Sequence, residues 1–329
     1  MRKQIEERER KFLSPFATLS SKTAGRKHEE KECPFRTAFQ KDRDKIIHSK
    51  AFRRLKHKTQ VFLSPAEDHY RTRLTHTIEV AQIARTISRA LGLNEDLTEA
   101  IAMGHDLGHT PFGHGGEDVL CEIVKQHGKT FRHNEQSVRV VEVLEKDGKG
   151  LNLCAEVIDG ILYHPQKVEW PHTLEGVVVR YADHFAYIRH DIEDALRAGV
   201  LKEKDLPKKH MKVLGPKILD VVVSDIIKMS RGKDKVKLSK NVQYAVDGLY
   251  DFLYKNVYTN MLAKKEETKI PILLRLLFRF YHYNADFQKG IKDSDHQLQH
   301  TIDFIAGMSD RFAINKFQDL FVPNEWRTV

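Results

Sequence analysis

Residues 70–117 read YRTRLTHTIEVAQIARTISRALGLNEDLTEAIAMGHDLGHTPFGHGGE, and apolar residues recur in this stretch every three or four positions. That spacing is typical of amphipathic helices. The first helix is expected over residues 72–91, and Gly92 should end it. Asn94 is a good N-cap for a second helix that runs to about Asp106. The apolar face of the first helix would consist of Ile78, Ala81, Ala84, Ile87 and Leu91.

A glycine-rich loop, LGHTPFGHGGED at residues 107–118, is expected after the second helix. Proline lacks an N–H and clashes with the preceding turn, so the chain should not remain helical past Pro111. The glycines would let the backbone approach a ligand closely. Several side chains that can bind metal or transfer protons fall within fourteen positions here: His105, Asp106, His109, His114, Glu117 and Asp118.

The later periodic segments are helical as well. A long helix is expected from Thr173 to Gly199, because the apolar stripe keeps a period of 3.6 even across the β-branched run 177–179. Two further amphipathic stretches lie around residues 241–262 and 271–283. No segment alternates convincingly with period two, so the predicted fold class is all-α.

The chain has 329 residues, a formal net charge of +9 and 40% apolar residues, which is typical of a globular protein of one or two domains. We expect a charged N-terminal arm with exposed helical turns over residues 1–50 and a helical core over 51–199. A helical C-terminal region over 200–329 should pack on that core. Within it, the Lys-rich segment 201–237 is expected to be a solvated excursion.

Composition also excludes some classes of protein. No uncharged run approaches the ~20 residues that a membrane-spanning helix needs. The N-terminal sequence MRKQIEERERKF lacks the apolar segment of a signal peptide, so a cytoplasmic protein is expected. The three cysteines, Cys33, Cys121 and Cys154, are widely spaced and are expected to stay reduced.

Four residues on or at the ends of the predicted helices suggest a metal site: His76, His105, Asp106 and Asp183. Imidazole and carboxylate donors together suit a first-row divalent ion such as Mn, Fe, Ni or Co. Two of each would leave coordination positions open for water, as a catalytic site needs. A lone histidine at any of these positions is more often a hydrogen-bonded core or surface residue. The density of such side chains around the glycine-rich loop favours the metal site.

These residues resemble the deoxynucleoside triphosphate triphosphohydrolases (dGTPase-like proteins) of the HD superfamily. Besides the stretch quoted above, the matching blocks include FRHNEQSVRVV at 131–141, GLNLCAEVIDGI at 150–161 and YADHFAYIRHDIEDALRAG at 181–199. Others are GRKHEEKECPFRTAFQKDRDKIIHSKAFRRLKHKTQVF at 25–62 and IAGMSDRFA at 305–313. The resemblance covers roughly residues 20–200 and 298–315 of the sequence.

The resemblance implies an HD-domain helical bundle with additional C-terminal helices. It also implies hydrolysis of a deoxynucleoside triphosphate at the α-phosphorus, which releases deoxynucleoside and inorganic triphosphate. The metal would be Mn, Fe, Mg, Ni or Co, with Mg on the substrate triphosphate. The sequence departs from many bacterial members at His184, where they carry a second Asp. The residues that match the family's metal ligands are His76, His105, Asp106 and Asp183.

Three residues match catalytic positions of the family. His114 matches its candidate acid, which would protonate the leaving 5′-oxygen of the deoxyribose. Glu117, three residues on, could hold the His114 imidazole and keep it protonated. His133 matches a second active-site histidine, and His109 matches a position that faces the phosphates.

Substrate contacts are expected along the long helix. Asp183, Tyr187 and Asp191 are spaced four residues apart and share one stripe, about 12 Å long. In the family the tyrosine stacks on the deoxyribose and the second aspartate bonds the 3′-hydroxyl, with Gln60 matching its partner. Arg73 lies one turn before the first predicted ligand and suits a triphosphate oxygen. Without the resemblance, Arg73 and Asp191 would be assigned to surface ion pairs.

The expected partners are the deoxynucleoside triphosphate, an activating nucleotide or single-stranded DNA, and further copies of the chain, with a hexamer as the candidate assembly. Two alternatives stay open. One is another HD-type phosphohydrolase: a phosphodiesterase, a nucleotidase or a guanosine tetraphosphate hydrolase. The other is a non-catalytic nucleic-acid-binding HD protein, which the pI of about 9.2 suggests.

Overall fold

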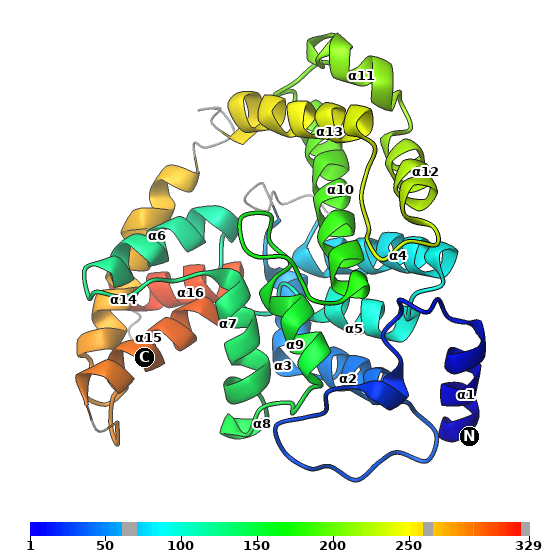
Figure 1. The fold of residues 1–329 in the computed structure, drawn as a ribbon. Coiled ribbons are helices and arrows are strands. Elements are labelled where there is room, and N and C mark those ends of the chain that lie inside the picture. The colour runs from blue at the N-terminus through cyan, green and yellow to red at the C-terminus, as the bar shows by residue number, and fades with distance from the viewer. Residues whose placement is uncertain (61–70, 259–265, 292, 324–329) are drawn as a thin grey trace, which may run out of the picture.

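A computed structural model describes residues 1–60, 71–258, 266–291 and 293–323 (Figure 1). Within these ranges the chain forms helices and no strand, which confirms the all-α prediction. The helices of the first half are α1 (Arg2–Phe12), α2 (Ala38–Ile47), α3 (Lys50–Arg54), α4 (Arg73–Leu91), α5 (Glu95–Gly104), α6 (Gly113–Lys125), α7 (His133–Arg139), α8 (Glu145–Gly148) and α9 (Ala155–Leu162). Those of the second half are α10 (Leu174–Arg197), α11 (Lys208–Leu214), α12 (Ile218–Ser230), α13 (Lys240–Leu253), α14 (Ile270–Tyr283), α15 (Ser294–Ala306) and α16 (Asp310–Phe321).

Helices α4 and α5 form where the sequence predicts them. Gly92 follows α4 with φ 70°, the left-handed C-cap that glycine favours. The Asn94 side chain accepts hydrogen bonds from two backbone N–H groups at the start of α5. The predicted apolar face is partly wrong, because Ile78 is 50% exposed, while Val80 and Ile83 are buried. The buried face is turned toward α5 and α10, which pack on either side of α4.

The glycine-rich loop is shorter than predicted. Helix α6 begins at Gly113, two residues after Pro111, and therefore contains the second half of the segment 107–118. Proline interrupts a helix that runs through it, but it does not prevent a new helix from starting directly after it. The turn that leads into α6 ends at Phe112, whose backbone is left-handed, with φ 64° and ψ 25°.

Two segments expected to be exposed contribute to the core instead. Phe39 and Ile46 of α2 are fully buried, although charged residues separate them in the sequence. In the Lys-rich segment 201–237, Val222 and Ile226 of α12 are fully buried. In both segments a few apolar residues at helical spacing suffice for packing, while the charged side chains cover the outer face.

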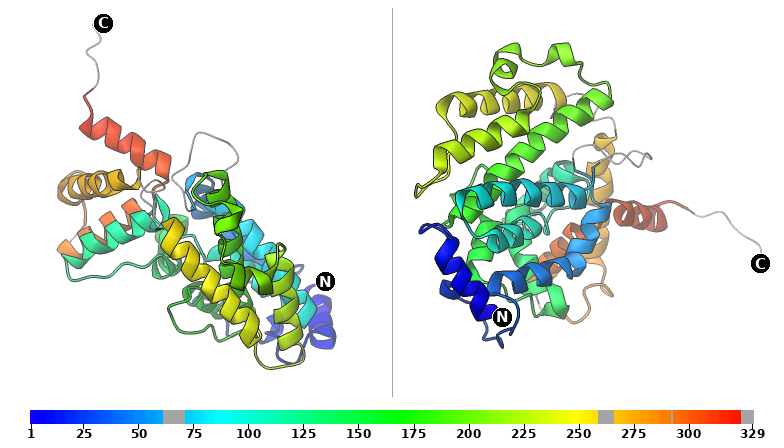
Figure 2. Two further views of the ribbon diagram at one scale, coloured as in Figure 1. Left: turned by 90° about the horizontal axis from the view of Figure 1, so that it is seen from above. Right: turned by 90° about the vertical axis from the view of Figure 1, so that its right-hand side faces the viewer.

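The buried apolar residues form two clusters. The first joins α2, α4, α5, α9 and α10 with α11, α12 and α13. The second joins α6 with α14, α15 and α16, which lie together at the left of Figure 1 and on one side of the molecule in Figure 2. The boundary expected at residue 199 does not separate these clusters, because α6 packs with the C-terminal helices. Among the described residues, no helix is both long and apolar enough to cross a bilayer.

The crossing of α5 and α9 gives a test of the packing. A Cβ atom at Gly160 would lie 2.5–2.7 Å from three side-chain carbons of Ile101. Helix propensity favours alanine over glycine by about 1 kcal/mol, but overpacking costs about 1–3 kcal/mol. We therefore expect Gly160→Ala to lower the free energy of unfolding, measured by urea denaturation. In an Ile101→Ala background the same change should cause no loss, and an equal loss in both backgrounds would contradict the close contact.

Candidate metal centre

Three structural elements bring the four predicted metal ligands together. His76 lies on α4, His105 and Asp106 follow α5, and Asp183 lies on α10. His76 Nε2 is 3.0 Å from Asp183 Oδ1, and His105 Nε2 is 3.7 Å from the same oxygen. His105 Nε2 is also 3.6 Å from Asp106 Oδ2. His76, His105 and Asp183 each place one donor atom within 4.8 Å of the other two, which fits one shared ion.

The orientation of His105 suits a metal ligand. Its Nδ1 lies 2.7 Å from the carbonyl oxygen of Ala102, to which it can only donate, so Nε2 carries the free lone pair. Nε2 is buried and has no hydrogen-bond partner among the described residues. A ring fixed by a bond from one nitrogen, with the other nitrogen open, is the usual arrangement of a metal-binding histidine. The residues present therefore fit a divalent ion.

Both carboxylates of this centre are ionised. Burial raises the pKa of Asp183, but His76 and His105 outweigh it and lower the pKa. Burial likewise raises the pKa of Asp106, but Arg73 and the histidines hold it well below its usual value. Arg73 Nη1 donates to Asp106 Oδ2 at 2.7 Å, while its Nε and Nη2 have no hydrogen-bond partner among the described residues. The centre thus has two negative charges and one fixed positive charge.

A second group of donors lies beside the first. Asp106, His109 and His133 each offer a ligand atom within 4.8 Å of the other two. The rings of His109 and His133 stack with centroids 4.6 Å apart. His109 is 1% exposed, and neither ring nitrogen has a hydrogen-bond partner in the described part of the chain. Burial, with Arg73 and His133 nearby, holds its pKa well below the usual value, so the ring is neutral.

Glu117 contacts both predicted catalytic histidines, but not equally. Its two carboxylate oxygens lie 2.9 Å from His133 Nδ1, and it also accepts the backbone N–H of His133. His114 Nδ1 is farther away, at 3.4 Å, and the His114 side chain is 56% exposed. Burial lowers the pKa of His133, but Glu117 outweighs it and raises the pKa. Burial raises the pKa of Glu117, but His133 and His114 outweigh burial, so the pKa of Glu117 lies well below its usual value. His133 and Glu117 therefore form a half-buried ion pair.

The stripe on α10 extends from the metal centre. The Tyr187 ring lies 6.2 Å from that of His76 and 6.0 Å from that of His114, between centroids. Asp191 is fully buried, and neither carboxylate oxygen has a hydrogen-bond partner among the described residues. Burial, followed by the charge of Asp194, holds its pKa well above the usual value. Gln60 is buried too, but within the described residues no hydrogen bond joins it to Asp191.

Two buried histidines that the sequence analysis did not select line the same centre. His164 Nδ1 lies 2.8 Å from the carbonyl oxygen of Ile161, and its Nε2 lies 3.3 Å from His133 Nε2. Burial lowers the pKa of His164 to about 3. His190 contacts Glu79, and its ring lies 5.7 Å from that of His76. For the pair of His190 and Glu79 the sequence does contain an indication, since Glu79 lies one turn after His76 on α4.

His184, where the sequence departs from the family pattern, contacts the C-terminal half of the chain. Its ring lies 5.3 Å from that of Tyr250 on α13, and burial lowers its pKa. The substitution therefore adds a neutral imidazole to the packing between α10 and α13.

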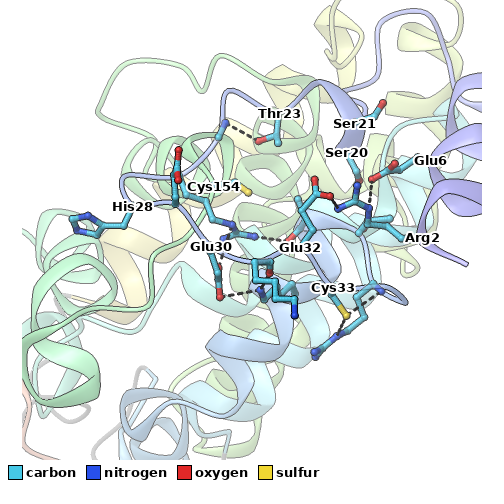
Figure 3. A pocket seen from close by; sticks show the side chains of 18 residues that line it. Arg2, Glu6, Ser20, Ser21, Thr23, His28, Glu30, Glu32, Cys33 and Cys154 are labelled. Carbon is cyan, nitrogen blue, oxygen red and sulfur yellow. Dashed lines mark hydrogen bonds and ion pairs between the residues drawn. The ribbon is translucent and has the colours of Figure 1, made fainter.

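A cavity of about 350 Å³ lies elsewhere, between the N-terminal segment and α2 (Figure 3). None of the predicted site residues lines it. Several of its charged groups are paired with one another, as in Arg2 with Glu32 at 2.8 Å and Lys41 with Glu30 at 2.9 Å. The cavity is therefore separate from the chemistry of the histidine cluster.

Comparison with known proteins agrees with this fold. Residues 73–188 match the HD domain, and residues 236–319 match the phosphohydrolase-associated domain. The protein is therefore an HD-type phosphohydrolase, a class whose domain binds a divalent metal. Proteins described as deoxyguanosinetriphosphate triphosphohydrolase-like, from Caldanaerobacter subterraneus subsp. tengcongensis, Desulfatibacillum aliphaticivorans and Clostridium tetani, are 53%, 49% and 44% identical to it. The alignments cover 98–99% of this chain and 97–98% of theirs. The chain belongs to this dGTPase-like family, as the resemblance predicted.

The geometry predicts that metal binding depends on Asp183. Asp183→Asn removes the charge nearest both imidazoles, so we expect the divalent metal content to fall at least tenfold, measured by mass spectrometry after dialysis. Circular dichroism would check that the fold is kept. Asp159→Asn is the matched control, because Asp159 pairs with the exposed His172 at 2.6 Å away from the site. Equal metal content in both variants would exclude Asp183 as a ligand.

Proposed function

We propose that the chain hydrolyses deoxynucleoside triphosphates at the α-phosphorus and releases deoxynucleoside and inorganic triphosphate. The observation that carries the proposal is the alignment of Asp183, Tyr187 and Asp191 along one stripe of α10. Asp183 is a carboxylate of the candidate metal site, Tyr187 is an aromatic ring, and Asp191 is a buried carboxylate with no hydrogen-bond partner among the described residues. The three follow one another over about 12 Å. That order suits the phosphate, the sugar ring and a sugar hydroxyl of one nucleotide. The relatives are described as deoxyguanosinetriphosphate triphosphohydrolase-like, which supports the same substrate class.

The ion would be held by His76, His105, Asp106 and Asp183, and Mn, Fe, Mg, Ni and Co all suit these donors. When bound, it supplies the Lewis acidity that activates water for attack on phosphorus. The protein's part is to keep both carboxylates ionised and the His105 lone pair free. Burial also keeps bulk water away from the reacting centre.

His114 is proposed to protonate the leaving oxygen. When water adds to the α-phosphorus, the bond to the 5′-oxygen breaks, and that oxygen needs a proton to leave as the deoxynucleoside hydroxyl. The His114 side chain is 56% exposed, so substrate can reach its ring, whereas the His133 side chain is only 14% exposed and its Nδ1 is bound to Glu117. Glu117 lies near His114 Nδ1, which leaves Nε2 to donate the proton.

The neighbouring cationic groups are proposed to bind the phosphates. The ion pair with Glu117 raises the pKa of His133 and favours its protonated form, and Arg73 Nε and Nη2 have no partner among the described residues. His109 adds a buried neutral ring stacked on that of His133. A triphosphate that carries Mg would bring its own cation to this pocket.

The sugar end is proposed to lie against Tyr187 and Asp191. The ring of Tyr187 would pack on the deoxyribose and leave little room for a 2′-hydroxyl. Asp191 would pair with the 3′-hydroxyl, since its oxygens lack partners within the described residues and burial at this site is costly without one. Gln60 Oε1 is also buried and has no partner among the residues that the structure describes, so it would be available to bind the substrate directly.

Product analysis tests the reaction. Wild-type protein with Mn or Mg should release triphosphate from deoxynucleoside triphosphates, supplied singly and in mixtures because an activating nucleotide is expected. His114→Ala should lower kcat by about 10²–10⁴-fold with unchanged metal content, because proton transfer is lost. His172→Ala, which changes an exposed histidine, should leave kcat unchanged. Release of pyrophosphate or of single phosphates instead of triphosphate would refute the proposed reaction.

The pH profile tests the phosphate-binding role of His133. Glu117→Gln removes the charge that raises the pKa of His133, so that pKa falls. Binding that needs the protonated ring is lost as the pH rises through this pKa, and the alkaline limb of kcat/KM should therefore move to lower pH. Glu122→Gln is the control, because Glu122 lies on the same helix but pairs with Arg275 at 2.6 Å. An alkaline limb that stays in place would show that His133 does not act as a cation.

A further inference from the structure

The candidate catalytic groups belong to different packing clusters. His76, His105 and Asp183 lie on helices of the first apolar cluster, whereas His114 and Glu117 lie on α6, which packs with α14, α15 and α16. The distance between the proton donor and the metal centre therefore depends on how the two clusters are held together. The connection nearest the site is the turn from His109 to Phe112, which leads into α6.

Asp310, the first residue of α16, holds one end of this turn. It is 7% exposed, and its Oδ1 accepts the backbone N–H of Phe112 at 2.8 Å. Its Oδ2 accepts the backbone N–H of Thr59 at 2.9 Å. One carboxylate thus joins the C-terminal helices, the catalytic turn and the segment before α4.

Lys58 holds the other end. It is 1% exposed, and its Nζ donates to the carbonyl oxygen of His109 and, at 2.9 Å, to that of Ala306 at the end of α15. Lys58 and Asp310 therefore bind the carbonyl at the start of the turn and the N–H at its end. Both are buried polar groups, and their burial is costly unless the bonds they make are maintained.

The conformation of the turn needs such support. Phe112 has a left-handed backbone, a conformation that is unfavourable for a bulky residue and persists only where neighbouring contacts enforce it. Phe112 is also the residue from which α6 starts, so its backbone angles set the direction of the helix. Two residues later, that direction decides where His114 points.

We infer that Asp310 and Lys58 are positioning residues for the proposed reaction. They hold the His109–Phe112 turn so that His114 and Glu117 face the metal centre, although neither residue takes part in the chemistry. The C-terminal helices thereby complete the active site without contributing a side chain that touches substrate. This inference rests on the proposed function, and it adds to it the contacts that set the position of the acid.

Asp310→Asn tests the inference with almost no change of shape. The amide has one acceptor oxygen and presents its NH₂ to the other backbone N–H, so one of the two bonds is lost. We expect kcat to fall by about 10–100-fold while KM and metal content change little, as expected when geometry at the reacting centre is lost. Lys58→Met should lower kcat in the same way.

Asp303→Asn is the matched control. Asp303 also ties α15 to the first half of the chain, through Arg139 at 2.7 Å and Gln136 at 2.9 Å, but not through the catalytic turn. It should lower the melting temperature and leave kcat unchanged at a temperature well below melting. If Asp310→Asn lowers only the melting temperature, as Asp303→Asn does, the positioning role is wrong. Loss of metal in Asp310→Asn would also overturn it.

Hydrogen exchange tests the contacts independently of turnover. At least one of the amides of Phe112 and Thr59 should exchange tenfold or more faster in Asp310→Asn than in the wild type, and both should exchange at the wild-type rate in Asp303→Asn. Unchanged exchange at both amides would show that Asp310 does not hold the turn. A wild-type protein that releases no triphosphate would count against the proposed function, while the exchange rates would still decide whether the turn is held as described.

Discussion

The ion pair between Arg73 and Asp106 is the interaction on which the candidate site depends. Both side chains are buried, and removing two charges from water costs several kcal/mol for each ion, so such a pair contributes little to stability. It joins the start of α4 to the turn after α5. Its effect is to keep Asp106 ionised and in place beside His105. The pair is therefore better explained by the metal centre that it organises than by the fold.

The same reasoning extends to the other buried polar groups. The cluster around Asp106 contains imidazole and guanidinium nitrogens that have no hydrogen-bond partner within the described residues, which is costly in a protein interior. The predicted metal ligands come from or follow helices of the first apolar cluster, whereas His114 and Glu117 come from α6, which packs in the second. A junction of this kind can accept a charged ligand without opening a core. It also makes the geometry of the site sensitive to the packing of α6 against the C-terminal helices.

Local patterns predicted much of the fold, because helix periodicity and capping act over a few residues. The helices after Thr72, Asn94 and Thr173 begin where a side chain accepts a backbone N–H, and each of these signals is visible in the sequence. The patterns failed in α2, where few apolar residues lie among many charges, and in α12, a mostly apolar helix inside a Lys-rich segment. In α2 and α12 only the packing partners decide that two or three side chains are buried, and the sequence around them does not reveal those partners.

The site shows the same limit. Spacing placed Asp183, Tyr187 and Asp191 on one stripe, because residues on a single helix have fixed relations. It could not show which carboxylate meets which imidazole across helices. Glu117 follows His114 by three residues, yet it lies closer to His133, which comes from another helix. His164 had no local signal at all, since an isolated histidine acquires its neighbours only through packing. Pairings between helices depend on crossing angles that are set by the whole core, so the sequence motif identifies the participants and the fold determines their roles.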